Sequence, residues 1–310
     1  MIDRQRKQLK QRVSQVEWDV NMGNHSTLKV GGRVDALVKV KTRNELGDLL
    51  VWAETDGVPW AIVGGGSNIL VASKRVEGIF LQLGDGFKEI QVADKKATAA
   101  GNVFVSVGGG CRLGQLVSFC SQKALAGMEW ATGIPGTVGG AIRMNAGAHG
   151  SQMADIVSSV ILVAQTGQIL EIPAQDITFG YRTTRLPRES AGERYVIVGC
   201  TLQLTSGKAE QVKKRCREYA HWRKQHQPGG AGSAGSFFKN PEDDSAGRLI
   251  EAVGLKGLQL GGAKISNKHA NFIINNGNAV PQDIVHLMEL IQHKVKAKTG
   301  VQLDPEVHIY

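Results

Sequence analysis

Apolar residues recur at helical spacing in two stretches of the chain that also carry helix-end signals. The first predicted helix follows a capping-box pattern, Thr42-x-x-Glu45, and stops at Gly57. Its apolar face is formed by Leu46, Leu49, Leu50 and Ala53. The second is a long helix opened by Pro281 and capped by Gly300. Its apolar face is formed by Ile284, Leu287, Met288, Ile291 and Val295.

Short apolar runs bounded by turn residues predict many strands along the chain. These runs are 60–63, 79–83, 90–92, 97–100, 103–107, 157–163, 169–172, 195–204, 263–265 and 272–274, with a terminal strand that carries Glu306. Further helices are predicted at 113–125, from 206 to about 225, and at 246–252. Because helices and strands are mixed throughout, the fold class is α+β. A charged helix followed by a glycine-rich loop marks a domain boundary near residue 205.

Two glycine-rich turns interrupt this pattern: VGGGSNIL at 63–70 and ATGIPGTVGGAIRMNAGAHG at 131–150. Glycine allows positive φ and close approach of a ligand to the backbone, and successive turn amides can bind an anion. Together the two turns can hold one diphosphate-bearing cofactor. The Rossmann and P-loop motifs are both absent from the sequence. The alternative interpretation is that these glycines only form tight turns.

Composition narrows the class of protein. The 310 residues suffice for two or three domains, and 42% of them are hydrophobic. No apolar stretch has the length of a membrane helix and the polar N-terminus does not resemble a secretory signal, so we expect a cytoplasmic protein without membrane insertion. The cysteines show neither CxxC nor zinc spacing and are interpreted as buried free thiols: Cys111, Cys120, Cys200 and Cys216.

The formal net charge of +9 predicts an anionic partner. Basic residues cluster at 4–12 and 213–224, but no nucleic-acid-binding motif accompanies them and only 5% of residues are aromatic. A small anionic ligand is therefore favoured over a nucleic acid. No obligate protein partner is evident.

Several runs in order resemble one family from about Asn24 to the end of the chain. They are VGGGSNIL, TGIPGTVGGAIRMNAGAHG, GYRTTRL, AGSFFKNP, SAGRLIE, KHANFIIN and GVQLDPEV. The chain is similar to UDP-N-acetylenolpyruvoylglucosamine reductases, the NADPH-dependent flavoenzymes that make UDP-N-acetylmuramate for peptidoglycan. The resemblance implies an FAD-binding domain of the vanillyl-alcohol oxidase type at 21–205, with lobes at 21–85 and 86–205. A C-terminal α+β substrate domain follows at 206–310, and a basic segment at 1–20 lies outside the match.

The resemblance also implies which residues contact non-covalently bound FAD. In the first turn these are Gly64, Gly65, Gly66, Ser67 and Asn68. In the second they are Gly133, Ile134, Pro135, Gly136, Thr137, Gly139, Gly140, Asn145 and Gly147.

Three catalytic residues are carried over from the family. Arg182 would stabilise charge on the substrate carboxylate, Ser236 would donate a proton, and Glu306 would face that carboxylate in its neutral, hydrogen-bond-donating form. Without the resemblance, Arg182 reads as a surface arginine paired with Glu189 or Glu193. Ser236 reads as a turn former and Glu306 as an exposed acid.

The substrate-binding residues implied in the same way are Tyr181, Lys224, Gln227, Lys239, Asn240 and His269. His269, between a lysine and a predicted buried strand, is as readily interpreted as structural. The histidine spacing indicates no metal site. Two other functions are weighed: a different flavin oxidase of the same fold, and a basic nucleotide-binding protein without catalysis. The visible absorbance of the pure protein separates the second from a flavoenzyme.

Overall fold

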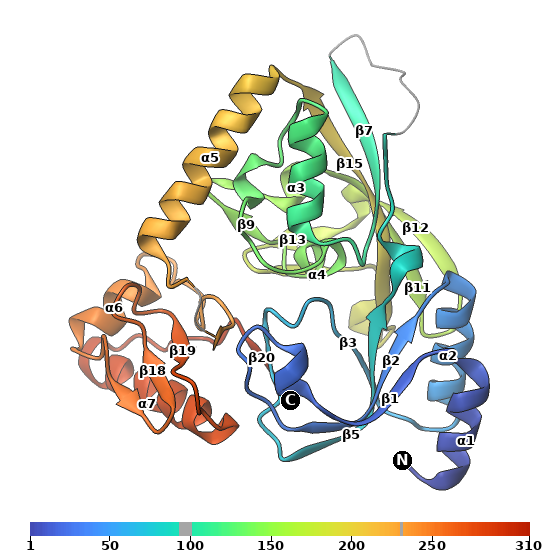
Figure 1. Cartoon of the computed structure of the whole chain (residues 1–310), viewed down its shortest axis with the longest axis horizontal. Coiled ribbons are helices and arrows are strands. Elements are labelled where there is room, and N and C mark those ends of the chain that lie inside the picture. The colour runs from blue at the N-terminus through green and yellow to red at the C-terminus, as the bar shows by residue number, and fades with distance from the viewer. Residues whose placement is uncertain (93–100, 230–231) are drawn as a thin grey trace. The chain divides into compact units, whose positions relative to one another are not determined.

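The computed structural model describes residues 1–92, 101–229 and 232–310, and helices and strands are mixed along these ranges (Figure 1). This confirms the predicted α+β class. The helices are α1 (Asp3–Arg12), α2 (Arg43–Thr55), α3 (Leu113–Gln122), α4 (Val138–Arg143), α5 (Ala209–His226), α6 (Ala246–Ala252) and α7 (Pro281–Thr299). None of the described helices is both long and apolar enough to cross a membrane.

The strands of the first half of the chain are β1 (Val16–Asn21), β2 (Arg33–Val40), β3 (Trp60–Ile62), β4 (Ile69–Leu70), β5 (Arg75–Leu83), β6 (Ile90–Val92), β7 (Asn102–Gly108), β8 (Leu125–Ala126), β9 (Gly147–Ala148) and β10 (Ser151–Gln152). The remaining strands are β11 (Val157–Ala164), β12 (Ile169–Pro173), β13 (Thr178–Gly180), β14 (Thr183–Arg185), β15 (Tyr195–Ser206), β16 (Gly232–Ser233), β17 (Gln259–Leu260), β18 (Ala263–Ile265), β19 (Ile273–Asn275) and β20 (His308–Ile309).

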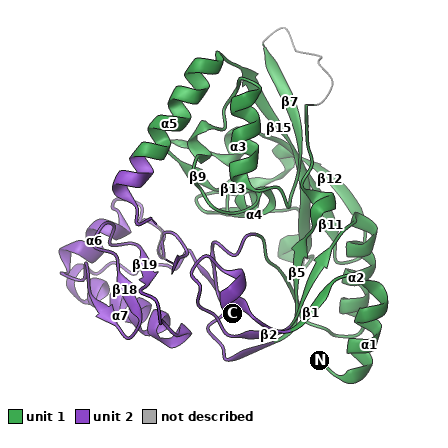
Figure 2. Cartoon of the chain, in the orientation of Figure 1, with its two compact units in different colours: residues 1–18, 36–64, 77–221 green, residues 19–35, 65–76, 222–310 purple. Residues whose placement is uncertain are grey.

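The chain divides into two compact units, each built from separated segments (Figure 2). The first unit comprises 1–18, 36–64 and 77–221, and the second comprises 19–35, 65–76 and 222–310. The chain passes from one unit to the other within β1, β2, β5 and α5 and between Gly64 and Gly65. The predicted domain boundaries at 20, 85 and 205 remain a prediction, since a division into compact units is not a test of them.

An antiparallel sheet of strand order β12-β11-β15-β7-β6 forms the centre of the first unit. Its register places Gly199 of β15 opposite Gly108 of β7. Alternate side chains of these strands are buried together with α3, which presents Leu116 and Cys120 to the same core. This core lies directly under the second glycine-rich segment, because Val138 and Ile142 of α4 belong to it.

A second core of the first unit gathers around α1 and α2. Leu9 of α1 is fully buried, and Gln8 accepts a hydrogen bond from Nε1 of Trp52 at 3.2 Å. The capping box of α2 is only half formed: Oγ1 of Thr42 accepts the Glu45 N–H at 3.1 Å, but the Glu45 carboxylate accepts the N–H groups of residues 41 and 14. The N-terminal basic segment thus contains a helix that packs on α2.

The second unit consists of a sheet of order β16-β19-β18-β17 with α6 and α7, and of a parallel pair, β4 with β20. The predicted face of α7 is the one that is buried, and Gly300 ends the helix with a φ of +75°. Phe237 and Phe238 belong to the same core. Each such side chain contributes roughly 1.5–3 kcal/mol by burial.

Several predicted elements differ from the structure at their ends: β5 begins at Arg75 and not at 79, and α5 begins at Ala209 and not at 206. The helix predicted at 113–125 ends at Gln122, because Ala124 is left-handed at φ +53° and Leu125–Ala126 pairs with β15. The terminal strand is confined to His308–Ile309 and does not include Glu306, since the preceding residues bond to the segment around Phe237 instead. The strand predicted at 97–100 lies outside the described residues.

Candidate active site

The first glycine turn follows β3 and leaves no room for side chains at two positions. A Cβ built on Gly64 would lie 2.5 Å from Oγ1 of Thr137, closer than a Cβ can approach. Gly66 has a φ of +65°, and a Cβ there would overlap the carbonyl oxygen of His25. Close packing of the protein itself therefore accounts for part of the glycine requirement, and in the first unit it brings Gly64 against the second glycine-rich segment.

Among the described residues, the fold does not use the backbone amides of the three glycines of this turn. The N–H groups of Gly64, Gly65 and Gly66 donate no hydrogen bond within the described residues, whereas the preceding N–H of Val63 donates to Leu81 at 2.8 Å. Successive turn amides of this kind attract an anion. The turn accordingly has the donors that a diphosphate requires.

Helix α4 begins in the second glycine-rich segment, and the protein uses the amides of its first turn. Oγ1 of Thr137 accepts the N–H of Gly140 at 3.4 Å. The N–H of Val138 donates to Cys111 at 2.9 Å, and that of Gly139 donates to Gly109 at 2.8 Å. The predicted cofactor contacts of Gly139 and Gly140 remain predictions, and they would have to use atoms other than these donors.

A third glycine run, residues 108–110, was missed by the sequence analysis. A Cβ on Gly109 would overlap the carbonyl oxygen of Ile197, and a Cβ on Gly139 would lie 2.9 Å from the same oxygen. The run therefore lets α4 approach the sheet at the edge where the glycine-rich segment begins. Its signal was present in the sequence, because VGGG occurs there for a second time.

Glu129 is a buried acid that the sequence analysis also missed. Its side chain is 5% exposed, and Oε2 accepts the N–H of Gly127 at 2.7 Å. Its carbonyl oxygen accepts both the N–H and Oγ1 of Thr132, at 3.1 and 2.7 Å. Glu129 thereby shapes the backbone that leads into Gly133, whose φ is +75°.

Tyr181 and Arg182 form the two-residue turn between β13 and β14, whose register pairs Gly180 with Thr183. Arg182 has a φ of +54°, a conformation that favours glycine, and its Nη1 donates to the carbonyl oxygen of Gly147 at 3.1 Å. The Arg182 guanidinium lies 5.4 Å from the centre of the Tyr181 ring, which is half exposed. The turn thus places the predicted catalytic arginine beside the end of the second glycine-rich segment.

The acids considered as ordinary partners of Arg182 have other partners. Glu189 pairs with Arg143 at 2.5 Å, and Glu193 pairs with Arg188 at 3.4 Å.

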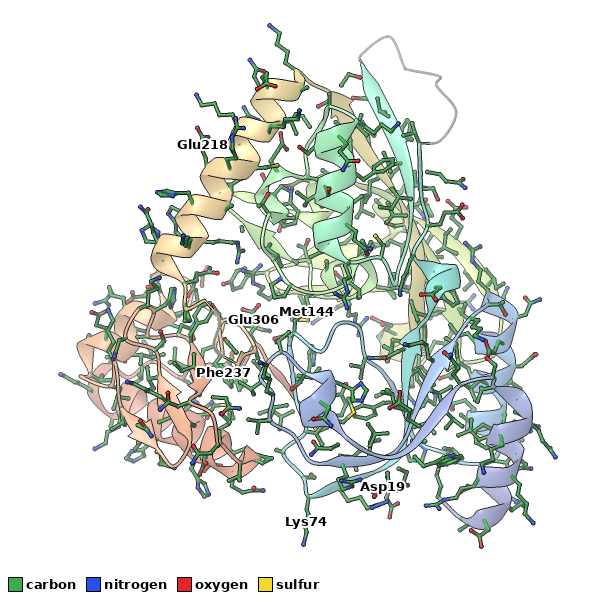
Figure 3. The ribbon with its side chains drawn as sticks, in the orientation of Figure 1. Asp19, Lys74, Met144, Glu218, Phe237 and Glu306 are labelled. Carbon is green, nitrogen blue, oxygen red and sulfur yellow. The ribbon has the colours of Figure 1, made fainter. Side chains whose placement is uncertain are left out.

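Ser236 and Glu306 are brought together in the second unit, where Phe237 and Glu306 are labelled in Figure 3. The N–H of Glu306 donates to the carbonyl oxygen of Phe237 at 2.8 Å, next to Ser236. The Glu306 carbonyl oxygen accepts Nδ2 of Asn68 at 3.0 Å. The side-chain amide of Asn68, predicted to contact the cofactor, thus also holds the backbone of a predicted catalytic residue.

The segment that follows Ser236 is locked by a buried amide. Asn271 is 3% exposed; its Oδ1 accepts the Phe238 N–H at 3.0 Å and its Nδ2 donates to the Phe238 carbonyl at 2.8 Å. The N–H of Lys239 donates to Asp304 at 2.9 Å. Asn240, a predicted substrate contact, accepts the Ala246 N–H at 3.1 Å and so helps to start α6.

The remaining predicted substrate contacts also lie in the second unit. Nδ1 of His269 accepts the N–H of Asn271 at 3.2 Å, and burial, with a smaller effect of Lys256, lowers the pKa of His269. Lys224 is exposed near the end of α5, and Oε1 of Gln227 accepts Nη1 of Arg223 at 2.7 Å. A structural role of His269 is evident, and the substrate contacts of all three remain predictions.

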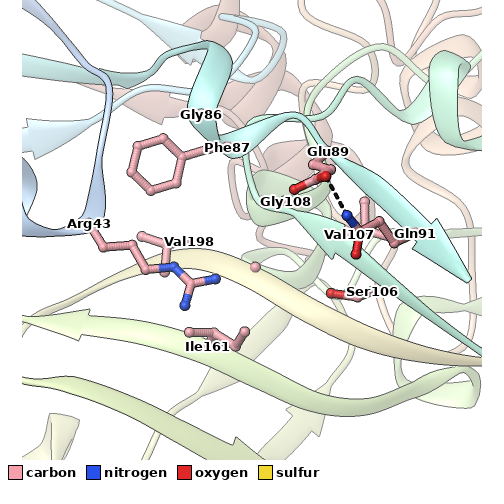
Figure 4. Close-up of a pocket in the computed structure, with 11 residues that line it drawn as sticks. Arg43, Gly86, Phe87, Glu89, Gln91, Ser106, Val107, Gly108, Ile161 and Val198 are labelled. Atoms are coloured by element: carbon pink, nitrogen blue, oxygen red, sulfur yellow. Dashed lines mark hydrogen bonds between the residues drawn. The ribbon is translucent and has the colours of Figure 1, made fainter. Parts of the chain in front are cut away.

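A pocket elsewhere in the first unit contains none of the predicted site residues (Figure 4). It is lined by Arg43, Phe87, Glu89, Gln91, Ser106 and Ile161, together with other residues, and Gln91 donates to Glu89 at its rim. In the described ranges, no three acidic, histidine or cysteine side chains are grouped as a metal site. All four cysteines are free, and only Cys216 is not fully buried.

Two family models match the chain in the predicted order. The model described as "FAD binding domain" matches residues 34–173. The model described as "UDP-N-acetylenolpyruvoylglucosamine reductase, C-terminal domain" matches residues 227–310.

Curated relatives and a solved structure agree over nearly the whole length. The UDP-N-acetylenolpyruvoylglucosamine reductase of Anoxybacillus flavithermus is 37% identical over 97% of this chain and 96% of its own. That of Clostridioides difficile is 38% identical over 95% and 93%. The crystal structure of the Thermus caldophilus reductase matches with a TM-score of 0.79 and 33% identity, covering 96% of this chain and 99% of that one.

Proposed function

The chain belongs to the family of UDP-N-acetylenolpyruvoylglucosamine reductases and is an FAD-dependent oxidoreductase; we propose that it reduces UDP-N-acetylglucosamine enolpyruvate to UDP-N-acetylmuramate. NADPH as the reductant, a non-covalent flavin and a cytoplasmic place in peptidoglycan precursor synthesis are parts of the proposal. The observation that carries it is the likeness along the whole chain, 37% identity over 97% of the residues.

The glycine turns fit the cofactor. The amides of Gly64, Gly65 and Gly66 are free to hold its pyrophosphate, and Gly133 to Thr137 would line the adjoining part. FAD held by these residues would supply the hydride-transfer chemistry between NADPH and the terminal vinyl carbon of the substrate.

Arg182 would hold the substrate carboxylate. Charge that develops on the α-carbon spreads onto this carboxylate, so a fixed cation beside it lowers the barrier. The planar guanidinium presents parallel donors that match a carboxylate. Its anchor on Gly147 at 3.1 Å supports this function, since it restrains the side chain before substrate arrives.

Ser236 would deliver the proton to the α-carbon. Its backbone is fixed between Gly235, at φ +82°, and the buried Phe237. Because a hydroxyl is a weak acid, a cation such as Lys239 or a relayed water would have to favour its proton loss. Glu306, held beside this segment by its own N–H, would donate a hydrogen bond to the substrate carboxylate when protonated.

An anaerobic half-reaction tests the proposal. We would reduce the purified protein with NADPH, add UDP-N-acetylglucosamine enolpyruvate and follow the flavin absorbance. We expect rapid reoxidation with formation of the lactyl ether. Ser236→Ala should keep reduction by NADPH and lose reoxidation by at least about 100-fold, the usual contribution of a positioned acid.

Ser245→Ala is the matched control, because Ser245 caps α6 in the same unit through the Arg248 N–H and takes no part in the proposed chemistry. It should keep both half-reactions. A colourless protein that binds no FAD would support the nucleotide-binding alternative, and a yellow protein indifferent to this substrate would indicate a different flavin oxidase.

A further inference from the structure

We propose that Asn145 and Thr184 are positioning residues for Arg182: they fasten its hairpin to the second glycine-rich segment, and through it they set the place of the guanidinium. The inference rests on the proposed function of Arg182. It assigns Asn145 a role for its side chain that differs from contact with a cofactor.

Both the donor and the acceptor of the Asn145 side-chain amide are used inside the first unit. Asn145 is 2% exposed, and its Nδ2 donates to the carbonyl oxygen of Gly180 at 3.0 Å and to Oε1 of Gln152 at 2.9 Å. Its Oδ1 accepts the N–H of Ala154 at 3.0 Å. Since its two backbone partners are one N–H donor and one carbonyl acceptor, only one orientation of the amide satisfies both.

Gly180 is the residue immediately before the Tyr181-Arg182 turn. The hydrogen bond from Asn145 to the Gly180 carbonyl oxygen therefore restrains the peptide group at the start of the turn. A second bond lies on the opposite strand of the hairpin: Oγ1 of Thr184, 2% exposed, donates to the carbonyl oxygen of Ile142 at 2.5 Å. Both strands of the hairpin are thus fixed to residues 142–145.

The backbone conformations of Asn145 and Arg182 explain why the hairpin must be held by these hydrogen bonds. Asn145 and Arg182 both have positive φ, +39° and +54°. This conformation is unfavourable for arginine, which keeps it only where surrounding contacts impose it. Without the bonds from Asn145 and Thr184 the turn would relax, and the guanidinium would leave its place beside Gly147.

A double-mutant cycle tests the proposal. We would measure kcat, KM and the rate of flavin reduction by NADPH for Asn145→Ala and Thr184→Val, each in the native chain and in Arg182→Lys. We expect each single variant to lower kcat about 10- to 100-fold, because small displacements of a positioned group have effects of this size. In the Arg182→Lys chain the further loss should be less than about 3-fold.

Thr42→Ala is the control for loss of stability alone, since it removes the cap of α2 in the same unit. Its kcat should stay within about 2-fold of the native value. Equal losses in the native and Arg182→Lys chains would overturn the proposal, as would variants that behave like Thr42→Ala.

If Asn145→Ala does not fold, Thr184→Val decides alone, because it keeps the volume of the side chain and removes one hydrogen bond. A native chain that fails to reduce the substrate would instead count against the proposed function. Flavin reduction by NADPH should be unchanged in folded Thr184→Val. A parallel loss of that rate would show that Thr184 acts on the cofactor, which also contradicts the proposal.

Discussion

His269 is a half-buried imidazole whose neutral form is favoured by the fold. Burial lowers its pKa, and Lys256 lowers it further. The unfolded chain, with an ordinary imidazole pKa of about 6.5, therefore takes up a proton at a pH where the folded chain does not. The contribution of His269 to stability is complete above about pH 6.5 and is lost as the pH falls through the lower folded pKa.

His269→Asn should remove this dependence while keeping an acceptor for the N–H of Asn271. We expect the denaturant midpoint of the native protein to fall more between pH 7.5 and 5.5 than that of the variant. Urea titrations at the two pH values measure the difference. Parallel pH dependences would show that the imidazole titrates alike in the folded and unfolded chains.

Contacts of single residues with distant segments of the chain could not be predicted from the sequence. The pattern around Gly64 and Gly66 indicated a ligand-binding turn, but the overlap with Thr137 and His25 depends on segments far away in the chain. The resemblance gave Arg182 and Asn145 as members of one site, yet their hydrogen-bonded connection through Gly180 could not be read from spacing. Such bonds depend on the register of a hairpin, and the sequence analysis predicted none at 178–185.

Helices α3 and α4 each contain a glycine whose replacement by alanine should change the free energy of unfolding, in opposite directions for the two helices. Gly114 of α3 is exposed and has open space where a Cβ would stand. Gly139 of α4 is buried, and its Cβ would meet the backbone oxygens of Ile197 and Gly109 at 2.9 and 3.1 Å. Gly114→Ala should raise the free energy of unfolding by about 0.5–1 kcal/mol, and Gly139→Ala should lower it by about 1–3 kcal/mol.

Urea unfolding of the two variants checks this pair, and each is the control for the other. A Gly139→Ala protein as stable as the native one would mean that α4 can move away from the sheet. Its flavin content should fall as well, since Thr137 at the start of α4 packs against Gly64.

Long elements with a clear apolar face were predictable, and short ones were predictable only where an apolar run marks them, as in β3, β6 and β18. The buried face of α7 was given residue by residue, because its period persists over five turns and both ends carry signals. The short strands of the β9-β10 and β13-β14 hairpins have no measurable period and were missed. The predicted helix extended beyond Gln122, which was wrong. Alanine favours helices, so the sequence did not indicate that Ala124 adopts a left-handed conformation.

All four cysteines belong to the first compact unit, and they can report on its opening. Burial raises the pKa of Cys111 to about 11 and that of Cys120 to about 12, and it raises the pKa of Cys200 further. In the folded protein at pH 8 a thiol reagent should therefore find at most one reactive cysteine per chain, Cys216. In urea it should find four.

Cys216→Ser should remove the one rapidly reacting thiol and leave three cysteines that react only when the protein unfolds. Fast reaction of two or more thiols in the native protein would show that the core around α3 opens readily. The second unit contains no cysteine, and neither does the core around α1 and α2, which includes Trp52 and Trp60. An unfolding transition seen by tryptophan fluorescence but not by thiol release would therefore belong to one of these two parts.

The order of the FAD-binding and C-terminal domains followed from the resemblance and agrees with the matched family models. The composition of the compact units did not follow from it. Residues 19–35 and 65–76 join the C-terminal part through backbone and side-chain bonds, such as that from Oγ1 of Thr27 to Ser233 at 2.6 Å. The local sequence around a residue does not indicate a hydrogen-bond partner that lies two hundred residues away in the chain.

The bond from Asn68 to Glu306 spans 238 residues, and this separation sets a time during synthesis. At about 5–20 residues per second, roughly 12 to 48 s pass on the ribosome between the appearance of Asn68 and that of its partner. Through this interval the nascent chain carries a glycine-rich turn whose last anchor has not been made. The bond to Glu306 can form only when translation is nearly finished, so the pyrophosphate contacts proposed for this turn would be completed late in the biogenesis of the enzyme.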